Sequence, residues 1–445
     1  MPSYIYAPEA AVVDGVILSR PGLLVDDQGI IQHLDNVEAL QSDFPGAFVQ
    51  RLDGELLLPG TVNGHNHAFQ VLMRGMGEDR DFMTWRSQVL YPVSERLTPD
   101  DIYQSAKLAY WDMLRHGITA VADFFYLNDQ GSDNALAIAR AAKDVGIRLL
   151  LARTFYDWEG APTRYRETPE EAHDHTLELQ QRLISEGLTP WVTLQVAPHS
   201  PHGASPAMVE AAVATQKALD THLHIHVAEG RYELEAMKQR TGMTPIQWCH
   251  HYGALGPKSL AIHAVWADQD DWDLLKNTHT TVVHNPASNM ILGDGIAPVV
   301  EMLARNIPVI LGTDGGCTND RHSIFDDMRM AALLQKVRFT DSSVIRAEDV
   351  FRMGSSAGNK ALGLPGGRLI PGEPFDAVSA SLDDPSLLPG PVTLGHLVYA
   401  MADTAIRNVY VKGERVIDHG QPTRFNPVPL TRWASRWQAD HTESR

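Results

Sequence analysis

The sequence predicts an α/β protein: a (β/α)8 barrel of the TIM type with a small β-sandwich built from both ends of the chain. Apolar, strand-like runs alternate with longer helical stretches through the middle of the chain, and short strands joined by turns occupy both ends. The 445 residues suffice for one barrel and a smaller companion domain. We therefore divide the chain into residues 1–57, 58–365 and 366–445, with the sandwich formed by the two outer parts.

The N-terminal part, residues 1–57, has the pattern of short strands joined by tight turns. Asp14-Gly15 lies between the apolar pairs Val12-Val13 and Val16-Ile17. An Asp-Gly pair between apolar residues is a strong signal for a two-residue hairpin turn. These residues are expected to lie outside the barrel.

The central part, residues 58–365, contains the helices and nearly all of the strands predicted for the barrel. The eight predicted strands are Leu56–His65, Ile118–Phe124, Ile147–Ala152, Trp191–Val196, Leu223–Ala228, Ser259–Ala264, Thr280–His284 and Ile307–Leu311. Strands that alternate with helices form parallel sheets, and eight such units close into a barrel. In these barrels the chemistry takes place at the carboxyl ends of the strands.

The C-terminal part, residues 366–445, returns to β character. Ala377–Leu382, Ile406–Val411 and Val416–Ile417 are predicted strands, and we expect them to pair with the N-terminal strands. A polar tail, residues 430–445, ends the chain.

Composition excludes several classes of function. The net charge of -18 disfavours binding to nucleic acid. Only two cysteines, Cys249 and Cys317, are present, so no disulfide framework is expected. We find neither a signal peptide in residues 1–20 nor an apolar run long enough to cross a membrane. A cytoplasmic protein is expected.

Histidines and one aspartate follow the predicted barrel strands. His65 and His67 are two residues apart, so on a strand they point the same way. His226, His263 and Asp314 come at the ends of three further strands. Neutral imidazoles with one carboxylate suit Zn²⁺, with Fe²⁺ or Mn²⁺ as alternatives. No lysine lies between Lys143 and Lys217, so a bridging lysine carbamate is excluded there and one metal ion is expected.

Glu229 stands three residues after His226, in the loop above the strand. It is either a solvent-facing carboxylate or a general acid/base beside a metal-bound water, whose pKa a metal lowers to about 7.

Together these segments resemble the amidohydrolase superfamily, in its mononuclear deaminase branch. The resemblance is strongest to S-adenosylhomocysteine/methylthioadenosine deaminases and the related triazine hydrolases, and it covers nearly the whole chain. It rests on Pro59-Gly60, His65-Asn66-His67, Arg74-Gly75, Glu78-Asp79, Ala197-Pro198-His199-Ser200-Pro201, His284-Asn285-Pro286-Ala287-Ser288-Asn289, Gly293-Asp294-Gly295-Ile296-Ala297-Pro298 and Gly312-Thr313-Asp314-Gly315.

The resemblance implies a role for each site residue. The metal ligands would be His65, His67, His226 and Asp314. The catalytic residues would be Glu229, which protonates the ring nitrogen, and His263 with Asp314, which hold and deprotonate the water. The substrate-binding residues would be Gln70, Arg86, Tyr126, Arg153, His199, His202 and Asn289.

Two departures bear on the substrate. Ser94, in Pro92-Val93-Ser94, replaces the glutamate that grips the ribose in adenosine-type members. Gln70, Arg86 and Tyr126 resemble residues of formimidoylglutamate deiminases, in which the arginine and tyrosine bind substrate carboxylates. His202 stands where those enzymes carry a second arginine.

The expected function is hydrolytic release of ammonia from an amidine-type C–N bond of an amino-substituted N-heterocycle: a purine, pterin, triazine or modified adenosine. The alternatives are deimination of an N-formimino amino acid, dechlorination of a triazine, and a non-catalytic binding barrel. The partner is expected to be a small-molecule substrate, and the protein a homo-oligomer, a dimer or larger.

Overall fold

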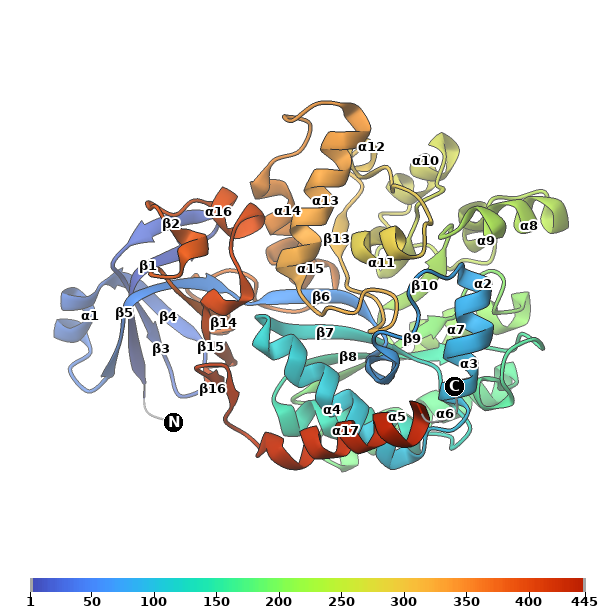
Figure 1. The fold of residues 1–445 in the computed structure, drawn as a ribbon, viewed down its shortest axis with the longest axis horizontal. Coiled ribbons are helices and arrows are strands. Elements are labelled where there is room, and N and C mark those ends of the chain that lie inside the picture. Colours follow the sequence, from blue (N-terminus) through green and yellow to red (C-terminus); the bar gives the residue numbers. More distant parts are fainter. Residues whose placement is uncertain (1–2, 443–445) are drawn as a thin grey trace.

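The structure, a computed structural model, describes residues 3–442, which form a barrel and a second sheet beside it (Figure 1). The barrel strands are β6 (Thr61–Asn66), β7 (Ile118–Phe125), β8 (Arg148–Phe155), β9 (Val192–Pro198), β10 (Leu223–Val227), β11 (Ser259–His263), β12 (Thr281–His284) and β13 (Val309–Leu311). They are hydrogen-bonded in chain order and run parallel. The predicted (β/α)8 barrel is confirmed.

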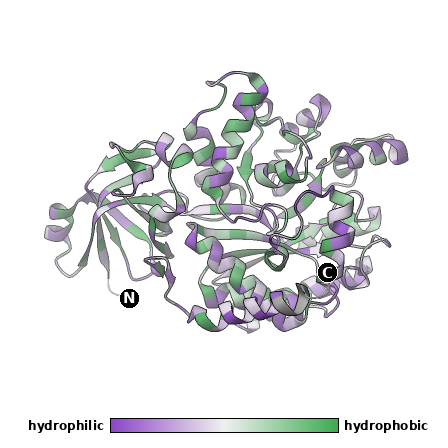
Figure 2. Ribbon diagram, in the orientation of Figure 1, coloured by the Kyte–Doolittle hydropathy of each residue, from purple (hydrophilic) through white to green (hydrophobic). Residues whose placement is uncertain are grey.

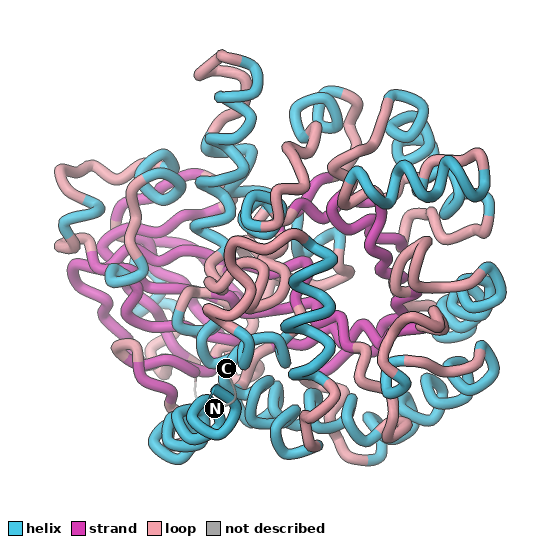
Figure 3. The backbone as a smooth tube through the Cα atoms, turned by 45° about the vertical axis from the view of Figure 1, so that its right-hand side comes forward, coloured by secondary structure: helices cyan, strands magenta, loops and turns pink. Residues whose placement is uncertain are grey.

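Helices surround the ring of strands, as Figure 3 shows in a view toward the barrel. The helices of the central part are α2 (Phe82–Trp85), α3 (Tyr91–Ser94), α4 (Pro99–Arg115), α5 (Asp133–Val145), α6 (Pro169–Ser185), α7 (Pro206–Leu219), α8 (Arg231–Thr241), α9 (Pro245–His251), α10 (Gln269–Asn277), α11 (Pro286–Ile291), α12 (Val299–Ala304), α13 (Ile324–Phe339), α14 (Ala347–Met353) and α15 (Ser356–Ala361). Several begin at a signal visible in the sequence, a threonine N-cap followed by proline: Thr98-Pro99, Thr168-Pro169 and Thr244-Pro245.

The barrel closes where its last strand meets its first. The Asp314 amide donates to the His65 carbonyl at 2.9 Å, and the Thr313 amide donates to Asn63 Oδ1 at 3.0 Å. Gly312 permits this approach, because a Cβ there would lie 2.4 Å from Asn285 Oδ1 and 2.9 Å from the His65 amide nitrogen. Closure therefore brings Asp314 beside His65.

Both ends of the chain contribute to the second sheet, which has nine strands. These are β1 (Tyr4–Val13), β2 (Val16–Ser19), β3 (Pro21–Val25), β4 (Ile31–Asn36), β5 (Phe48–Pro59), β14 (Ala377–Ser381), β15 (Ile406–Val411), β16 (Glu414–Asp418) and β17 (Gln421–Pro422). Antiparallel pairing of β5 with β14 joins the two ends, with Leu58 opposite Val378. The predicted β unit from both termini is thus present, with its strands hydrogen-bonded into one continuous sheet.

The predicted turn at Asp14-Gly15 joins β1 to β2. Val13 pairs with Val16, and both turn residues have positive φ, 48° and 82°. These values match the two-residue hairpin that an Asp-Gly pair favours.

One strand prediction is wrong. The apolar run Leu56–Leu58 belongs to β5 of the terminal sheet, whereas the first barrel strand begins at Thr61. Between them the chain passes Gly60, where a Cβ would lie 2.4 Å from the Thr119 side chain. Apolarity alone did not reveal this change of sheet, because the end of β5 is as fully buried as β6.

Helices α1 (Val37–Asp43), α16 (Leu394–Tyr399) and α17 (Pro427–Thr442) complete the fold. The last of them occupies much of the predicted polar tail, whose end, residues 443–445, lies outside the described residues. No helix within residues 3–442 is both long and apolar enough to span a membrane.

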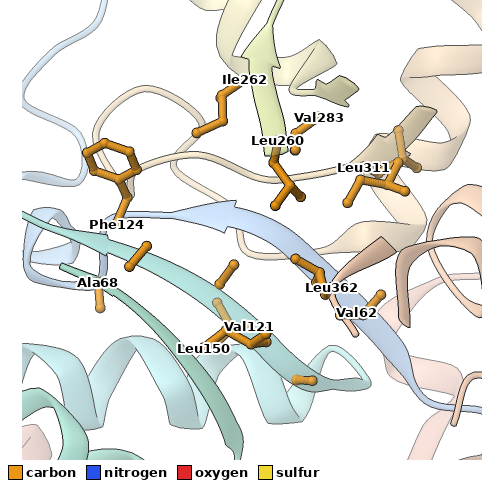
Figure 4. Close-up of a cluster of buried hydrophobic side chains, with 14 of the residues drawn as sticks. Val62, Ala68, Val121, Phe124, Leu150, Leu260, Ile262, Val283, Leu311 and Leu362 are labelled. Atoms are coloured by element: carbon orange, nitrogen blue, oxygen red, sulfur yellow. The ribbon is translucent and has the colours of Figure 1, made fainter. Parts of the chain in front are cut away.

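The hydrophobic core lies inside the barrel and between strands and helices. Hydrophobic residues concentrate on the strands, whereas outer helices such as α8 are hydrophilic (Figure 2). Figure 4 shows Val62, Val121, Leu260 and Leu311 in one buried cluster, contributed by four different strands. This packing holds the strand ends, and the polar side chains on them, in a fixed arrangement.

Candidate active site

Four polar side chains meet at the carboxyl ends of the barrel strands. His65 Nε2 lies 3.2 Å from His226 Nε2 and 3.3 Å from Asp314 Oδ1, and His67 Nε2 lies 3.5 Å from the same oxygen. All four residues are buried. The ligand atoms of His65, His67 and His226 lie within 4.8 Å of one another, as do those of His65, His263 and Asp314. The structure therefore brings together all four residues expected to bind a metal.

Hydrogen bonds set the direction of two of the imidazoles. His67 Nδ1 lies 2.6 Å from the Phe124 carbonyl, and His226 Nδ1 lies 2.9 Å from the His199 carbonyl. A carbonyl only accepts, so both Nδ1 atoms carry the proton and both Nε2 atoms present a lone pair to the cluster. Lone pairs facing one another need a cation between them, so these residues fit a divalent metal such as Zn²⁺.

The protonation states also fit a cation. Burial lowers the pKa of His67 to about 3 and lowers that of His226 well below its usual value, so both are neutral ligands. Burial alone would raise the pKa of Asp314, but hydrogen bonding and charge interaction with His65 hold it well below the usual range. The Asp314 carboxylate also accepts hydrogen bonds from Ser288 Oγ at 2.6 Å and from the Gly315 amide at 2.7 Å.

The backbone is strained at this site. His263, Asp314 and Ala228 have φ values of 76°, 61° and 51°, in the left-handed region that non-glycine residues rarely occupy. Such strain persists only where the surroundings impose it, and it concentrates at functional sites. The strained residues lie at or just after the ends of three barrel strands, within or beside the polar cluster.

Glu229 and His263 stand next to the four-residue cluster. Glu229 Oε1 lies 3.5 Å from His263 Nε2, and both side chains are buried. Burial raises the pKa of Glu229 well above its usual value, and the nearby Asp294 and Asp314 raise it further. Burial lowers the pKa of His263 to about 4. Burial therefore favours the protonated carboxyl of Glu229 and the neutral imidazole of His263, a pair suited to proton transfer.

Asn289 takes a different place from the one expected. It does not line the cavity; its Nδ2 donates to His263 Nδ1 at 3.1 Å and to Asp294 Oδ2 at 3.1 Å. Asn285 Nδ2 lies 3.2 Å from the same His263 nitrogen. These amides orient His263. Asn289 therefore supports His263 instead of lining the cavity, where the predicted contact with substrate would be made.

A partly enclosed cavity opens onto the cluster. Its walls include seven of the predicted site residues beyond the metal cluster: Gln70, Arg86, Tyr126, His199, His202, Glu229 and His263. Aromatic side chains form much of the remainder: Phe82, Trp85, Tyr91, Tyr156 and Tyr165.

The polar wall residues are tied to neighbours. Gln70 Nε2 donates to the Tyr126 hydroxyl at 2.8 Å, and the Cys317 thiol donates to Gln70 Oε1 at 3.2 Å. His199 stacks on Tyr156, with ring centroids 4.1 Å apart, and burial lowers its pKa well below the usual value. His199 is therefore a neutral, oriented hydrogen-bonding group.

Arg86 is a cation in the cavity wall, and no carboxylate lies within ion-pair distance of it among residues 3–442. Its guanidinium lies over the rings of Trp158, Tyr91 and Phe82, at 4.8, 5.6 and 5.7 Å from their centroids. Its Nε is buried without a hydrogen-bond partner. Aromatic faces hold the charge without neutralising it, which leaves donors for an anionic group.

Arg153 does not reach the cavity, contrary to its predicted contact with substrate. Its side chain is fully buried, and its guanidinium binds Glu167 through contacts of 2.6 and 2.7 Å. A buried cation needs such a partner, and here the protein supplies one.

Three further residues of the site were not identified as functional from the sequence. Ser288 and Asp294 lay within motifs already noted, and Glu233 stands four residues after Glu229 at the start of α8. Their contacts with Asp314, Asn289 and Glu229 depend on loop geometry. Glu229 lies before α8 begins, so no helical spacing signals its contact with Glu233.

The fold and this cluster define a barrel with a metal-binding hydrolase site. A family model, the amidohydrolase family, matches residues 56–416. The chain is 35% identical over 425 residues to a 5-methylthioadenosine/S-adenosylhomocysteine deaminase of Nitratidesulfovibrio vulgaris, covering 94% of this chain and 93% of that one. It is 31% identical over 415 residues to a 5'-deoxyadenosine deaminase of Methanothermobacter thermautotrophicus, covering 92% of each. This chain belongs to the amidohydrolase family, as the sequence motifs predicted.

Solved structures show the same fold. A zinc-bound adenosine deaminase of Xanthomonas campestris has a TM-score of 0.90 at 24% identity, with 99% of this chain and 98% of that one covered. An atrazine chlorohydrolase of Arthrobacter aurescens, complexed with zinc, has a TM-score of 0.89 at 22% identity, with 98% and 100% covered.

Proposed function

We propose that this protein is a metal-dependent hydrolytic deaminase that releases ammonia from an amidine-type C–N bond of an amino-substituted N-heterocycle: a purine, pterin, triazine or modified adenosine. The observation that carries the proposal is the buried pair Glu229 and His263, 3.5 Å apart, beside the histidine–aspartate cluster at the floor of an aromatic cavity. Relatives named as adenosine-type deaminases, matched over nearly their whole length, support it.

His65, His67, His226 and Asp314 would hold one divalent cation, with Zn²⁺ as first choice and Fe²⁺ or Mn²⁺ as alternatives. When bound, the cation supplies the Lewis acidity that generates hydroxide at neutral pH. Zinc in two structural neighbours supports this choice.

The protein's own groups move the protons. Glu229, protonated because it is buried, donates its proton to the ring nitrogen next to the attacked carbon and so makes that carbon electrophilic. Neutral His263, whose Nδ1 accepts from the Asn289 amide and whose Nε2 therefore carries the proton, donates a hydrogen bond that orients the attacking water, and Asp314 takes the proton from that water. Aromatic walls stack on a flat heterocycle and exclude bulk water.

Ammonia release from metal-replete protein tests this function. The panel contains 5'-deoxy-5'-methylthioadenosine, 5'-deoxyadenosine, oxidised purines, pterins, aminotriazines and N-formimino amino acids. Turnover of a ring compound would support the proposal. Chloride release from chlorotriazines, with no ammonia from the panel, would instead support the dechlorination alternative, and no turnover with stoichiometric metal would favour a non-catalytic barrel.

Unpaired Arg86 favours a second candidate, deimination of an N-formimino amino acid whose carboxylate would pair with the guanidinium. Turnover of formimino acids alone, lost on the change Arg86→Gln, would decide for it. The homo-oligomeric state and the cytoplasmic location remain predictions, which size-exclusion chromatography with light scattering and cell fractionation would test.

A further inference from the structure

Two buried polar atoms without hydrogen-bond partners face each other at the cavity wall. Glu233 Oε1 and His202 Nδ1 are 3.7 Å apart, and neither makes a hydrogen bond to any of the described residues 3–442. The Glu233 side chain is only 1% exposed. Leaving a buried carboxylate oxygen unpaired is costly, and a small rotation of the imidazole would satisfy both atoms at once.

Two further hydrogen bonds hold the segments that carry Glu233 and His202 in place. The second Glu233 oxygen, Oε2, accepts a hydrogen bond from the Glu229 amide at 3.0 Å. Arg240, in the last turn of the same helix α8, donates to the carbonyl of Pro201, next to His202, at 2.8 Å. Helix α8 therefore holds the loop of His202 and the loop of Glu229 together.

The proton position on His202 follows from this contact. A carboxylate only accepts, so a hydrogen bond between these two atoms places the proton on His202 Nδ1. In the neutral ring Nε2 then has a lone pair and no proton. His202 lines the cavity while its Nδ1 is buried, so Nε2 is the nitrogen left for a ligand.

We propose that Glu233 is a positioning residue that fixes His202 with its proton on Nδ1, so that Nε2 accepts a hydrogen bond from an N–H or O–H group of the substrate. The inference rests on the proposed function in taking this cavity as the substrate site. It adds a specificity element: this wall selects a ligand that offers a donor, as amino-substituted heterocycles and hydroxylated substrates do.

The substitution Glu233→Gln gives a sharp test. The glutamine carbonyl can keep the bond from the Glu229 amide, while its NH₂ group, facing His202 Nδ1, forces the proton to Nε2. Long-range ¹H–¹⁵N spectra of the zinc-loaded, histidine-labelled full chain report which nitrogen is protonated, and His202→Phe assigns the signal. We expect the Nδ1–H form in the wild type and the Nε2–H form in Glu233→Gln.

Kinetics measure the consequence with the fastest ring substrate of the ammonia panel. Losing one hydrogen bond should raise KM about tenfold with kcat nearly unchanged, and the effects of Glu233→Gln and His202→Phe should not add. An exposed neighbour on α8, changed in Glu235→Gln, should alter neither readout, since its side chain is 70% exposed.

The outcomes that would contradict the proposal lead to different conclusions. The Nε2–H form in the wild type, or a tautomer unchanged by Glu233→Gln, would overturn the proposal and leave Glu233 as support for the Glu229 loop alone. The expected tautomers with an unchanged KM would overturn the role in recognition. A panel without any turnover would refute the proposed deaminase function while the spectra still decide whether Glu233 positions His202.

Discussion

At the scale of single residues, the site depends on side chains whose polar atoms have one partner in the protein and one face left for ligand. His67 and His226 each donate a hydrogen bond from Nδ1 to a backbone carbonyl, and the Nε2 atom of each faces the cluster. One carboxylate oxygen of Asp314 accepts a hydrogen bond from Ser288, and the other faces His65 and His67. Preorganisation of this kind lets the groups act without rearranging during the reaction.

Glu229→Gln should keep the fold and one bound metal per chain but lower kcat by about 10²–10⁴-fold, because the proton donor is removed while the shape remains. The measurement is steady-state ammonia release together with metal analysis of the purified variant. Glu235→Gln, at the surface of α8, is the matched control and should retain full activity. A rate near that of the wild type would show that another group carries the proton.

Sequence reasoning located the strand-end residues well, because a residue at the end of a parallel barrel strand has little choice of direction. The structure brings together His65, His67, His226, His263 and Asp314. Residues on loops or along strands were harder to place. Arg153 lies in a strand whose residues are all buried, and only the position of Glu167 on a distant loop decides that it turns away from the cavity.

At the scale of elements, a buried carboxyl group joins three parts of the barrel wall. Asp123, in β7, accepts a hydrogen bond from the Tyr110 hydroxyl of α4 and another, at 3.0 Å, from the Ala68 amide just after His67. Burial raises the pKa of Asp123 to about 7. The loop that follows the first metal-site strand is therefore anchored by a group that is protonated below neutral pH.

This raised pKa predicts how stability changes with pH. In the unfolded chain Asp123 ionises near pH 4, whereas in the folded protein it keeps its proton up to about pH 7. Its contribution is fully present below pH 4 and is lost as pH rises toward 7, by about 4 kcal/mol at most. Asp123→Asn should remove that dependence, so the variant gains stability relative to the wild type as pH rises. Urea unfolding at pH 5, 6, 7 and 8 measures the difference.

Tyr103 and Asp144 form a matched pair at the surface, with the hydroxyl 2.5 Å from the carboxylate. Asp144→Asn removes a comparable tyrosine–carboxylate hydrogen bond at the surface, so it controls for the loss of the bond itself. Equal slopes for Asp123→Asn and the wild type would mean that Asp123 is ionised in the folded protein.

The elements themselves were largely predictable, because hydrophobic periodicity and helix caps are local signals. The hairpin at Asp14-Gly15 and the caps at Thr98 and Thr168 follow directly from residue types. The membership of Leu56–Leu58 in the terminal sheet was not local. It depends on pairing with Val378 and its neighbours more than 300 residues later, and an apolar run looks the same in either sheet.

At the scale of the whole molecule, a buried ion pair links the barrel to the terminal sheet. Arg148, at the start of β8, pairs with Asp376, just before β14, and also donates to the Pro365 carbonyl at 2.9 Å and to Asn359 Oδ1 at 3.2 Å. Asp376 in turn accepts from the Lys412 amide at 2.7 Å. The base of the barrel, opposite the active site, is therefore tied to the C-terminal part of the chain.

Arg148→Met should lower the free energy of unfolding by about 3–5 kcal/mol, because it leaves the Asp376 charge buried without its partner. Adding Asp376→Leu should restore much of that loss, since an apolar pair of similar volume needs no compensation. The surface pair Arg182–Asp133, with side chains 32% and 63% exposed, is the control, and Arg182→Met should cost less than about 1 kcal/mol. Urea unfolding of the wild type and the three variants measures these differences. Equal costs for Arg148→Met and Arg182→Met would show that the terminal sheet is held to the barrel by apolar packing alone.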